Sequence, residues 1–435
     1  MIWLLLAACS GGVPTSAPAP TPSVAPVTPT PPTPGFGSPP GPAPAPSAAP
    51  GPTVWTVANV KDLVPVAPSH NNAVPKPIPG LPAYDGALAI LGKVVDARDG
   101  DPENPWAIAH GLLARGKEFR LSDGREAVAH LFASYAEPRA AGALTLVGFP
   151  TSVGKVRVEP HTDLLLKNMS EAGVDPAATF TTRTGTVSAA DLYRMTMLKT
   201  YLVAATNHSS FTDPGDISWT LQGLASWAPG KLSWTATDGT AMNLDDLTSF
   251  DAAVLVQESA FMVADMKAGH DFQRTGQPLF SYPCGGAHLV QGVAYAVARG
   301  FGTPKDRSVV EGQVPLLFYR LPIELKIYDQ ALHEHGDYKL KLTVQRMKFL
   351  GHWLETISKL QAMGLFVPDT TQLTAIEGAA QNLVVTVADL QKQGAFDHLD
   401  EIRAKDEQIY LDIIGDSAHS VRGLELALGR GKVNW

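Results

Sequence analysis

Two side chains that can bind a metal or attack a substrate lie four residues apart in "SYPCGGAHLVQG", residues 281–292. On a helix, Cys284 and His288 would share one face, roughly 6 Å apart, so that a thiolate and an imidazole could hold the same Zn²⁺. A helix N-terminus would stabilise the thiolate, which also suits a nucleophilic cysteine with His288 as its base. The simplest alternative is a glycine-rich helix start with a small buried thiol.

Two ligands do not complete a zinc site, and the chain contains two cysteines, Cys9 and Cys284. The remaining ligands would therefore come from histidine or aspartate side chains elsewhere in the sequence. The candidates that could complete the shell are His161, Asp163, His352, Asp416 and His419. Zinc is thus a candidate cofactor, and the sequence indicates no other.

Several apolar segments each carry one unusual polar side chain, as in "WAIAHGLL" around His110 and "VLVQESAF" around Glu258. If these segments surround one cavity, the polar groups would form a shared ligand-binding or catalytic site there. An enzyme predicts that at least three of them converge, whereas a structural protein predicts that they are scattered and satisfied by local hydrogen bonds. The expected set is His110, His161, Glu258, Cys284, His288, His352 and His419.

A second group of residues suggests sugar chemistry: Asn207 and His208 are adjacent, with Arg274 and Tyr282 downstream. This group resembles the toroidal uronate lyases of the alginate-lyase type, although the flanking aromatic residues of the lyase motif are absent. The resemblance implies that Asn207 and Arg274 neutralise the uronate carboxylate while Tyr282 or His208 removes the α-proton. A helix cap followed by a turn would equally explain the Asn-His pair.

The elements that would position these residues are mainly helical beyond residue 85. Apolar residues recur at helical spacing from Ser188, from Asp245 and from Lys339, with Gly, Pro and Asp between the runs. Strand patterns are few, at 143–150 and at 231–240, and the second predicts a hairpin. The domain is therefore expected to be mainly α.

A polar residue next to a glycine recurs on the predicted helices at intervals of roughly 60 to 110 residues. The widest interval contains one further predicted helix, in 159–173, so the pattern predicts six helical hairpins. The glycines are Gly111, Gly223, Gly292, Gly351 and Gly423. Six hairpins closing in a ring resemble the α/α toroids of terpenoid cyclases, protein prenyltransferases, lanthionine cyclases and several polysaccharide lyases. An open α-solenoid would give the same pattern. The prenyltransferase and lanthionine-cyclase resemblance implies zinc held by cysteine, histidine and sometimes aspartate.

The first residues, "MIWLLLAACSGG", end an apolar run at Cys9. This resembles the lipobox of bacterial lipoproteins, although the usual Lys/Arg residues before the apolar run are missing. The resemblance implies that residues 1–9 form a signal peptide and that Cys9 carries lipid, palmitate included, which anchors the protein to a membrane of the cell envelope. Ser10 after the cysteine implies the outer membrane.

Composition divides the rest of the chain. Residues 10–54 are rich in Pro, Ala and Thr, which predicts a disordered tether, and 55–84 form a proline-rich lead-in to a toroid-like domain at 85–435. The net charge of −8 and the lack of a Lys/Arg run exclude nucleic acid as an expected partner. An envelope polysaccharide or a small ligand is the expected partner, bound either by an enzyme, metal-dependent or a polysaccharide lyase, or by a non-catalytic scaffold or binding lipoprotein.

Overall fold

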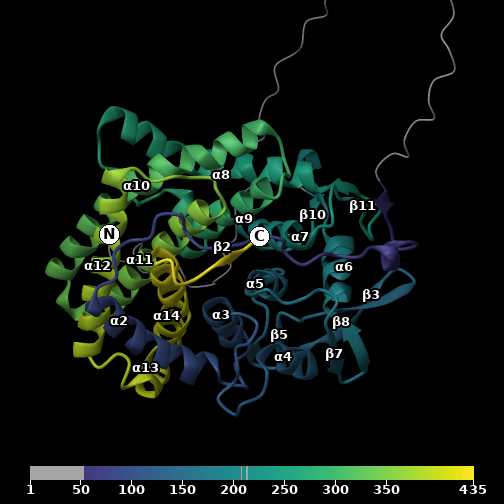
Figure 1. The fold of residues 1–435 in the computed structure, drawn as a ribbon, viewed down its shortest axis with the longest axis horizontal. Coiled ribbons are helices and arrows are strands. Elements are labelled where there is room, and N and C mark those ends of the chain that lie inside the picture. The colour runs from purple at the N-terminus through teal and green to yellow at the C-terminus, as the bar shows by residue number, and fades with distance from the viewer. Residues whose placement is uncertain (1–52, 207, 212–213) are drawn as a thin grey trace, which may run out of the picture.

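The computed structural model describes residues 53–206, 208–211 and 214–435. The lipid-anchor prediction at Cys9, nearly all of the predicted tether and the predicted site residue Asn207 lie outside the described residues. Within the described part, long helices dominate and the strands are short (Figure 1). The prediction of a mainly α protein is therefore confirmed.

The helices are α2 (Pro82–Val94), α3 (Pro105–Arg115), α4 (Ala127–Tyr135), α5 (Leu164–Ala172), α6 (Ala189–Lys199), α7 (Ile217–Trp227), α8 (Leu244–Ala268), α9 (Ala287–Ala298), α10 (Pro304–Glu334), α11 (Lys339–Ala362), α12 (Thr370–Lys392), α13 (Leu399–Lys405) and α14 (Glu407–Ala427). The strands are β1 (Val54–Trp55), β2 (Asn71–Asn72), β3 (Glu137–Ala141), β4 (Leu144–Gly148), β5 (Ser152–Val153), β6 (Val156–Arg157), β7 (Thr179–Thr182), β8 (Gly185–Ser188), β9 (Leu202–Val203), β10 (His208–Ser209), β11 (Ser233–Thr235), β12 (Ala241–Asn243) and β13 (Val433–Asn434).

Six helices contact one another in a cycle that returns to its start. The order is α3, α5, α7, α9, α11, α14 and again α3, and these helices lie around the centre of the view in Figure 1. The helices that precede them in the chain lie outside, as α8 does against α9, α10 against α11 and α12 against α11 and α14. The chain therefore alternates between an outer and a central helix.

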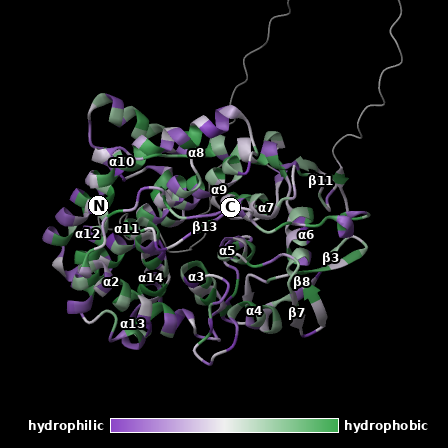
Figure 2. Ribbon diagram, viewed as in Figure 1, coloured by the Kyte–Doolittle hydropathy of each residue, from purple (hydrophilic) through white to green (hydrophobic). Residues whose placement is uncertain are grey.

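Burial follows this alternation. Every residue of α7 is buried, as are nearly all residues in the second half of α14, whereas α12 alternates buried and exposed positions. Figure 2 shows hydrophilic residues along the outward sides of peripheral helices such as α12 and α13. Since an amphipathic helix buries one face and a central helix buries all faces, the sequence pattern of each helix matches its place in the structure.

Local signals fix the helix ends. Capping boxes begin α6 at Ser188, α10 at Thr303 and α12 at Asp369, each satisfying backbone amides that the helix leaves unpaired. The helix predicted from Lys339 is α11, and the one predicted from Asp245 is α8. The hairpin predicted at 231–240 is present but extends further, because β11 pairs with β12, which lies at Ala241–Asn243.

The N-terminal lead-in and the C-terminal segment pair with each other beside the central helices. Strand β2 pairs antiparallel with β13, so that Asn72 lies opposite Val433, and both strands lie near the centre in Figures 1 and 2. Val433 is fully buried, and the Asn434 side chain donates a 2.7 Å hydrogen bond to the carbonyl of Glu171 on α5. This contact ties the C-terminal segment to the central helices.

Among the described residues, α8 alone is long and apolar enough to cross a membrane, and 44% of its most apolar window is buried. Helix α8 packs against α7, α9 and α10. A core helix of this composition passes the same test of length and hydropathy, so the finding is weak evidence for a membrane span.

Candidate metal centre

Four histidines from four central helices face one another in the interior. They are His110 on α3, His288 on α9, His352 on α11 and His419 on α14, and all are less than one tenth exposed. The ring centroids of His352 and His419 are 3.8 Å apart, and His288 lies 5.3 Å from His352 and 5.5 Å from His419. His110 joins this cluster at 5.4 Å from His419.

Hydrogen bonds along the helices orient two of these rings. His110 Nδ1 lies 2.8 Å from the carbonyl of Trp106, and His352 Nδ1 lies 3.0 Å from the carbonyl of Lys348. In a neutral imidazole the nitrogen facing a carbonyl carries the proton, so the lone pair is on Nε2. His352 Nε2 and His288 Nδ1 are buried without a hydrogen-bond partner. The two rings therefore offer nitrogens suited to bind a metal.

Burial keeps these histidines neutral. Desolvation, followed by the neighbouring imidazoles, lowers the pKa of His288 and of His352 well below the ordinary value. The same causes lower the pKa of His110 to about 3. A metal competes with protons for imidazole nitrogen, so neutral rings favour metal binding near pH 7.

Cys284 lies in a strained turn, and here the structure corrects the sequence prediction. Cys284 and His288 do not share a helix face, because α9 begins at Ala287 and Cys284 belongs to the short turn Pro283–Gly286 (η6). The φ angle of Cys284 is 54°, a left-handed conformation that costs a non-glycine residue roughly 1 kcal/mol or more. Such strain is often found at functional sites, where the surrounding structure maintains it.

The two glycines after Cys284 allow the chain to form this turn. Gly285 and Gly286 have φ angles of 58° and 80°. A Cβ atom on Gly286 would lie 2.4 Å from the side chain of Leu279, and one on Gly285 would lie 2.6 Å from the Arg320 guanidinium. Arg320 also donates a 2.7 Å hydrogen bond to the Gly285 carbonyl. The turn is therefore built for close packing and is held by α10.

The turn brings Cys284 to the histidines. Three ligand atoms, one from each of Cys284, His288 and His352, lie within 4.8 Å of one another. Bond lengths of about 2.0 to 2.3 Å in tetrahedral geometry need ligand atoms closer than this, at roughly 3.3 to 3.8 Å, a difference that small side-chain rotations can close. This group of residues can hold a metal.

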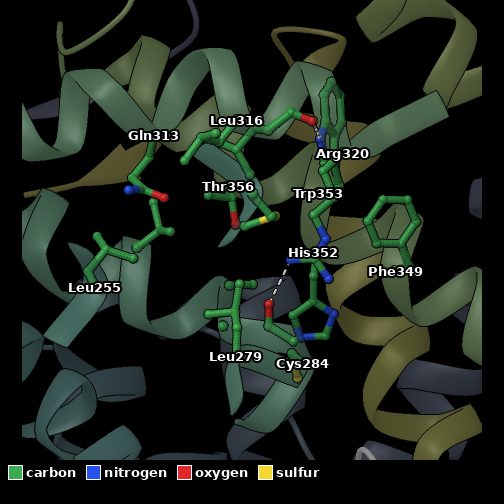
Figure 3. Close-up of a pocket in the computed structure, with 16 residues that line it drawn as sticks. Leu255, Leu279, Cys284, Gln313, Leu316, Arg320, Phe349, His352, Trp353 and Thr356 are labelled. Carbon is green, nitrogen blue, oxygen red and sulfur yellow. Dashed lines mark hydrogen bonds between the residues drawn. The ribbon is translucent and has the colours of Figure 1, made fainter. Parts of the chain in front are cut away.

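A cavity of about 30 Å³ adjoins two of the three residues, Cys284 and His352. Cys284 and His352 lie on its wall, and most of the remaining wall is aliphatic or aromatic, as Figure 3 shows for Leu255, Leu279, Leu316, Phe349 and Trp353. A metal bound at this wall would keep part of its coordination shell open to the cavity. Open coordination of this kind distinguishes catalytic from structural zinc sites.

A buried network of charged side chains contacts His419. His419 Nδ1 lies 2.6 Å from Glu355, and Lys359 lies 2.5 Å from both Glu355 and Glu171. Lys167 lies 3.0 Å from Glu171. Burial alone would raise the pKa of Glu171, but Lys167 and Lys359 lower it to about 2. Opposite charges thus compensate one another within an interior that excludes water.

The repeated polar residues next to the glycines join neighbouring central helices. The Gln222 amide donates to Glu171 at 3.0 Å, and the Gln291 amide donates to Thr356 at 2.9 Å while accepting from Lys359 at 2.9 Å. Gln222 and Gln291 therefore have a structural explanation, which is to link α7 to α5 and α9 to α11.

His161 is at the edge of the histidine cluster. It lies in the loop before α5, stacks on Trp219 at 4.5 Å, and its Nδ1 is 3.4 Å from Asp216. Trp219 lies 4.8 Å from His288, so His161 reaches the cluster through an aromatic ring. Trp219, Trp227 and Trp234 are all buried, which excludes them as an exposed sugar-binding surface.

Two aspartates considered as ligands have other partners. Asp163 accepts hydrogen bonds from Thr196 and Thr220 and pairs with Lys199 at 2.7 Å. Asp416 lies 3.7 Å from Lys348 and 3.8 Å from His352 Nδ1, the nitrogen that faces the Lys348 carbonyl. Asp416 therefore contacts a predicted ligand without facing its unpartnered nitrogen.

The described residues of the lyase hypothesis are His208, Arg274 and Tyr282. His208 is exposed on β10, 2.8 Å from Asp238. Arg274 pairs with Glu324 at 3.2 Å and stacks on Phe280, and Tyr282 precedes the turn of Cys284. These contacts give the proposed uronate site no support.

Glu258 is nearly buried on α8, with one carboxylate oxygen unpartnered, and burial raises its pKa. It does not line the cavity, although Leu255 and Met262 of the same helix do.

The charged pairs of the interior were not predicted from the sequence. Lys167 and Glu171, and likewise Glu355 and Lys359, are spaced four residues apart, which is typical of exposed helix pairs. For Glu355 and Lys359 a signal was available, because α11 also contains Gly351 of the glycine repeat and His352. Helix α5, which contains Lys167 and Glu171, has no glycine or histidine, so the sequence offered no such signal for that pair.

The chain was compared with family models, curated proteins and solved structures, and none of the three comparisons found a match.

Proposed function

We propose that the protein is a zinc-dependent enzyme whose metal is held by Cys284, His288 and His352. The observation that carries this proposal is the convergence of ligand atoms of the three side chains within 4.8 Å, with Cys284 and His352 on the wall of a cavity. Two buried imidazole nitrogens without partners, His288 Nδ1 and His352 Nε2, further support it. Sulfur and nitrogen ligands favour Zn²⁺ over the oxygen-binding ions Mg²⁺ and Ca²⁺.

The chemistry of the proposed enzyme would depend on the coordination position of zinc that is open to the cavity. Zinc with three protein ligands can polarise a carbonyl group or activate a bound water near neutral pH. His419 adds a group that can move a proton, because its Nδ1 is committed to Glu355 and its Nε2 keeps the lone pair. Lys359 and Lys167 keep Glu355 charged, since both lower the pKa of its carboxyl.

We also infer that the cycle of central helices is an α/α toroid. The closed contact order of α3, α5, α7, α9, α11 and α14, each next to an outer helix, supports a ring over an open solenoid. In such a ring the ends of the central helices surround one site, which is where the histidines meet.

The N-terminal sequence supports an envelope location. The lipobox-like "LAAC" at 6–9 and the proline-rich stretch after it suit a lipoprotein that holds its domain away from the outer membrane. The proposed enzyme would then act on a small ligand or an envelope polymer.

Metal analysis of the purified protein tests the zinc proposal. We expect about one zinc per chain in the wild type, and loss of that zinc in the variants Cys284→Ala and His352→Ala. With Co²⁺ in place of zinc, the wild type should show a thiolate-to-metal absorption band that Cys284→Ala lacks. The matched control is His110→Gln, which changes a histidine of the same cluster outside the proposed ligand set and should keep the metal.

Two results would overturn the proposal. One is wild-type protein that stays metal-free after reconstitution with Zn²⁺. The other is unchanged zinc content in folded Cys284→Ala or His352→Ala.

A further inference from the structure

The cavity beside Cys284 and His352 has one cationic side chain in an apolar wall. Arg320 of α10 lines it, as do several aliphatic and aromatic side chains, and Figure 3 shows the guanidinium lying toward His352. The other polar side chains of the wall are bonded elsewhere, since Gln313 donates to Ser259 and Thr356 accepts from Gln291. Arg320 is therefore the group in this wall that can recognise a charged ligand.

One nitrogen of the Arg320 guanidinium can still donate a hydrogen bond. Its Nε donates to Glu324 at 2.9 Å and its Nη1 to the Gly285 carbonyl at 2.7 Å. The structure gives Nη2 no acceptor among the described residues. Glu324 is fully buried and is shared between Arg320 and Arg274. A buried guanidinium with an open donor and a shared counter-ion favours an anionic ligand, and its planar fork matches a carboxylate.

We propose that this cavity binds a small monocarboxylate whose short apolar part lies against the wall and whose carboxylate accepts hydrogen bonds from Arg320. This inference deepens the proposed function and rests on it for the reacting centre. A carboxylate held at Arg320 would place the rest of the ligand next to Cys284 and His352.

The size and polarity of the cavity limit the apolar part. A volume of about 30 Å³ accommodates roughly two or three water-sized groups, so only a short part of the ligand is enclosed and the rest extends toward the open side of the cavity. A second charge on the ligand would face Leu255, Leu279 or Leu316 without a partner, which is costly in an apolar site. The ligand, or the end of a larger substrate, therefore carries one negative charge and a short aliphatic group.

Titration of the full chain with four probes of similar size tests the inference. The probes are butanoate, butan-1-ol, butylammonium and succinate, each added to zinc-loaded and to metal-depleted protein and followed by calorimetry. We expect butanoate to bind to both forms, and the other three to bind about tenfold to a hundredfold more weakly, the range that a charge-assisted hydrogen bond contributes.

The variant Arg320→Met tests the named contact and should weaken butanoate binding by a similar factor. The matched control Arg307→Met changes an exposed arginine of the same helix, paired with Glu311, and should leave the affinity unchanged. Circular dichroism checks that each variant is folded. If Arg320→Met does not fold, the relative affinities of wild-type protein for the four probes still test the inference.

The outcomes separate the two proposals. Butanoate binding that is Arg320-dependent in protein that takes up no zinc overturns the zinc proposal and keeps this one. This inference is overturned if butan-1-ol or butylammonium binds as tightly as butanoate, if butanoate binds only to zinc-loaded protein, or if folded Arg320→Met keeps full affinity.

Discussion

Cys284 lies beside the histidines for a reason that its spacing from His288 does not predict. The i, i+4 spacing to His288 indicated a shared helix face, but three consecutive residues adopt left-handed backbone conformations before α9 begins. Two glycines make such a turn accessible, and Arg320 and Leu279 pack against it. The proximity of thiol and imidazole is thus a result of tertiary contacts with α10 and η5 (Pro278–Ser281) and not of helix geometry.

Lys359 is expected to be among the most sensitive residues for stability. It is fully buried between Glu171 and Glu355, so Lys359→Met leaves two buried carboxylates short of a counter-charge. We expect the free energy of unfolding at pH 7 to fall by about 3 to 5 kcal/mol, measured by urea denaturation. The control Lys392→Met removes an exposed lysine that pairs with Asp389 at 3.4 Å and should change stability by less than about 0.5 kcal/mol. An equal effect of both variants would contradict the structural role of the buried cluster.

Two buried groups with lowered pKa values, Glu171 and His110, contribute to the pH dependence of stability. The pKa of Glu171 falls from 4.5 to about 2 on folding, so its contribution is present above pH 4.5 and is lost as the pH falls toward 2. The pKa of His110 falls from 6.5 to about 3, so the folded state also loses stability as the pH falls below 6.5. Each such group contributes about 1.4 kcal/mol per pH unit in its window. Burial raises the pKa of Glu159 to about 8, which changes stability in the opposite direction, so the contribution of Glu171 is measured as the difference between wild type and Glu171→Gln. This difference in the free energy of unfolding should shrink as the pH falls below 4.5. A difference that stays constant from pH 7 to 3 in urea titrations would exclude the charged state assigned to Glu171.

The close packing of the central helices depends on their glycines. A Cβ on Gly292 of α9 would lie 2.7 Å from the carbonyl oxygen of Ser218 on α7, and one on Gly423 of α14 would lie 2.6 Å from the carbonyl oxygen of Gly351 on α11. Both neighbours are backbone atoms, which cannot move without shifting a helix. The glycine repeat of the sequence is therefore the signal of close contacts between neighbouring central helices.

Alanine substitutions test this role of the glycines. Gly292→Ala and Gly423→Ala should each lower the free energy of unfolding by about 1 to 3 kcal/mol through overpacking. Gly378 on the outer helix α12 has no atom near its added Cβ, so Gly378→Ala should raise stability by up to about 1 kcal/mol. Thermal and urea unfolding of the three variants measure these changes. Stabilisation by all three would show that the central helices tolerate side chains at these positions.

The membrane anchor proposed from the sequence would be a property of the whole molecule and would depend on residues before the described domain. If Cys9 carries lipid, wild-type protein produced in a bacterium with a lipoprotein-processing system should label with radioactive palmitate and sediment with membranes. Cys9→Ala should lose the label and move to the soluble fraction, whereas Cys284→Ser should keep both properties. Membrane association that survives in Cys9→Ala would point to another anchor.

The sequence by itself determined the mainly α class, the helix at 339–362, the hairpin at 231–240 and the glycine positions where helices approach closely. These features depend on local propensity and on the period of a helix, which can be read along the chain. Only the tertiary structure decided which polar residues meet. His110, His288, His352 and His419 lie on helices far apart in sequence, and the closed order of contacts brings them together. The pairs Lys167–Glu171 and Glu355–Lys359 have the spacing of surface ion pairs and became interior charges only because their helices are enclosed by neighbours on every side.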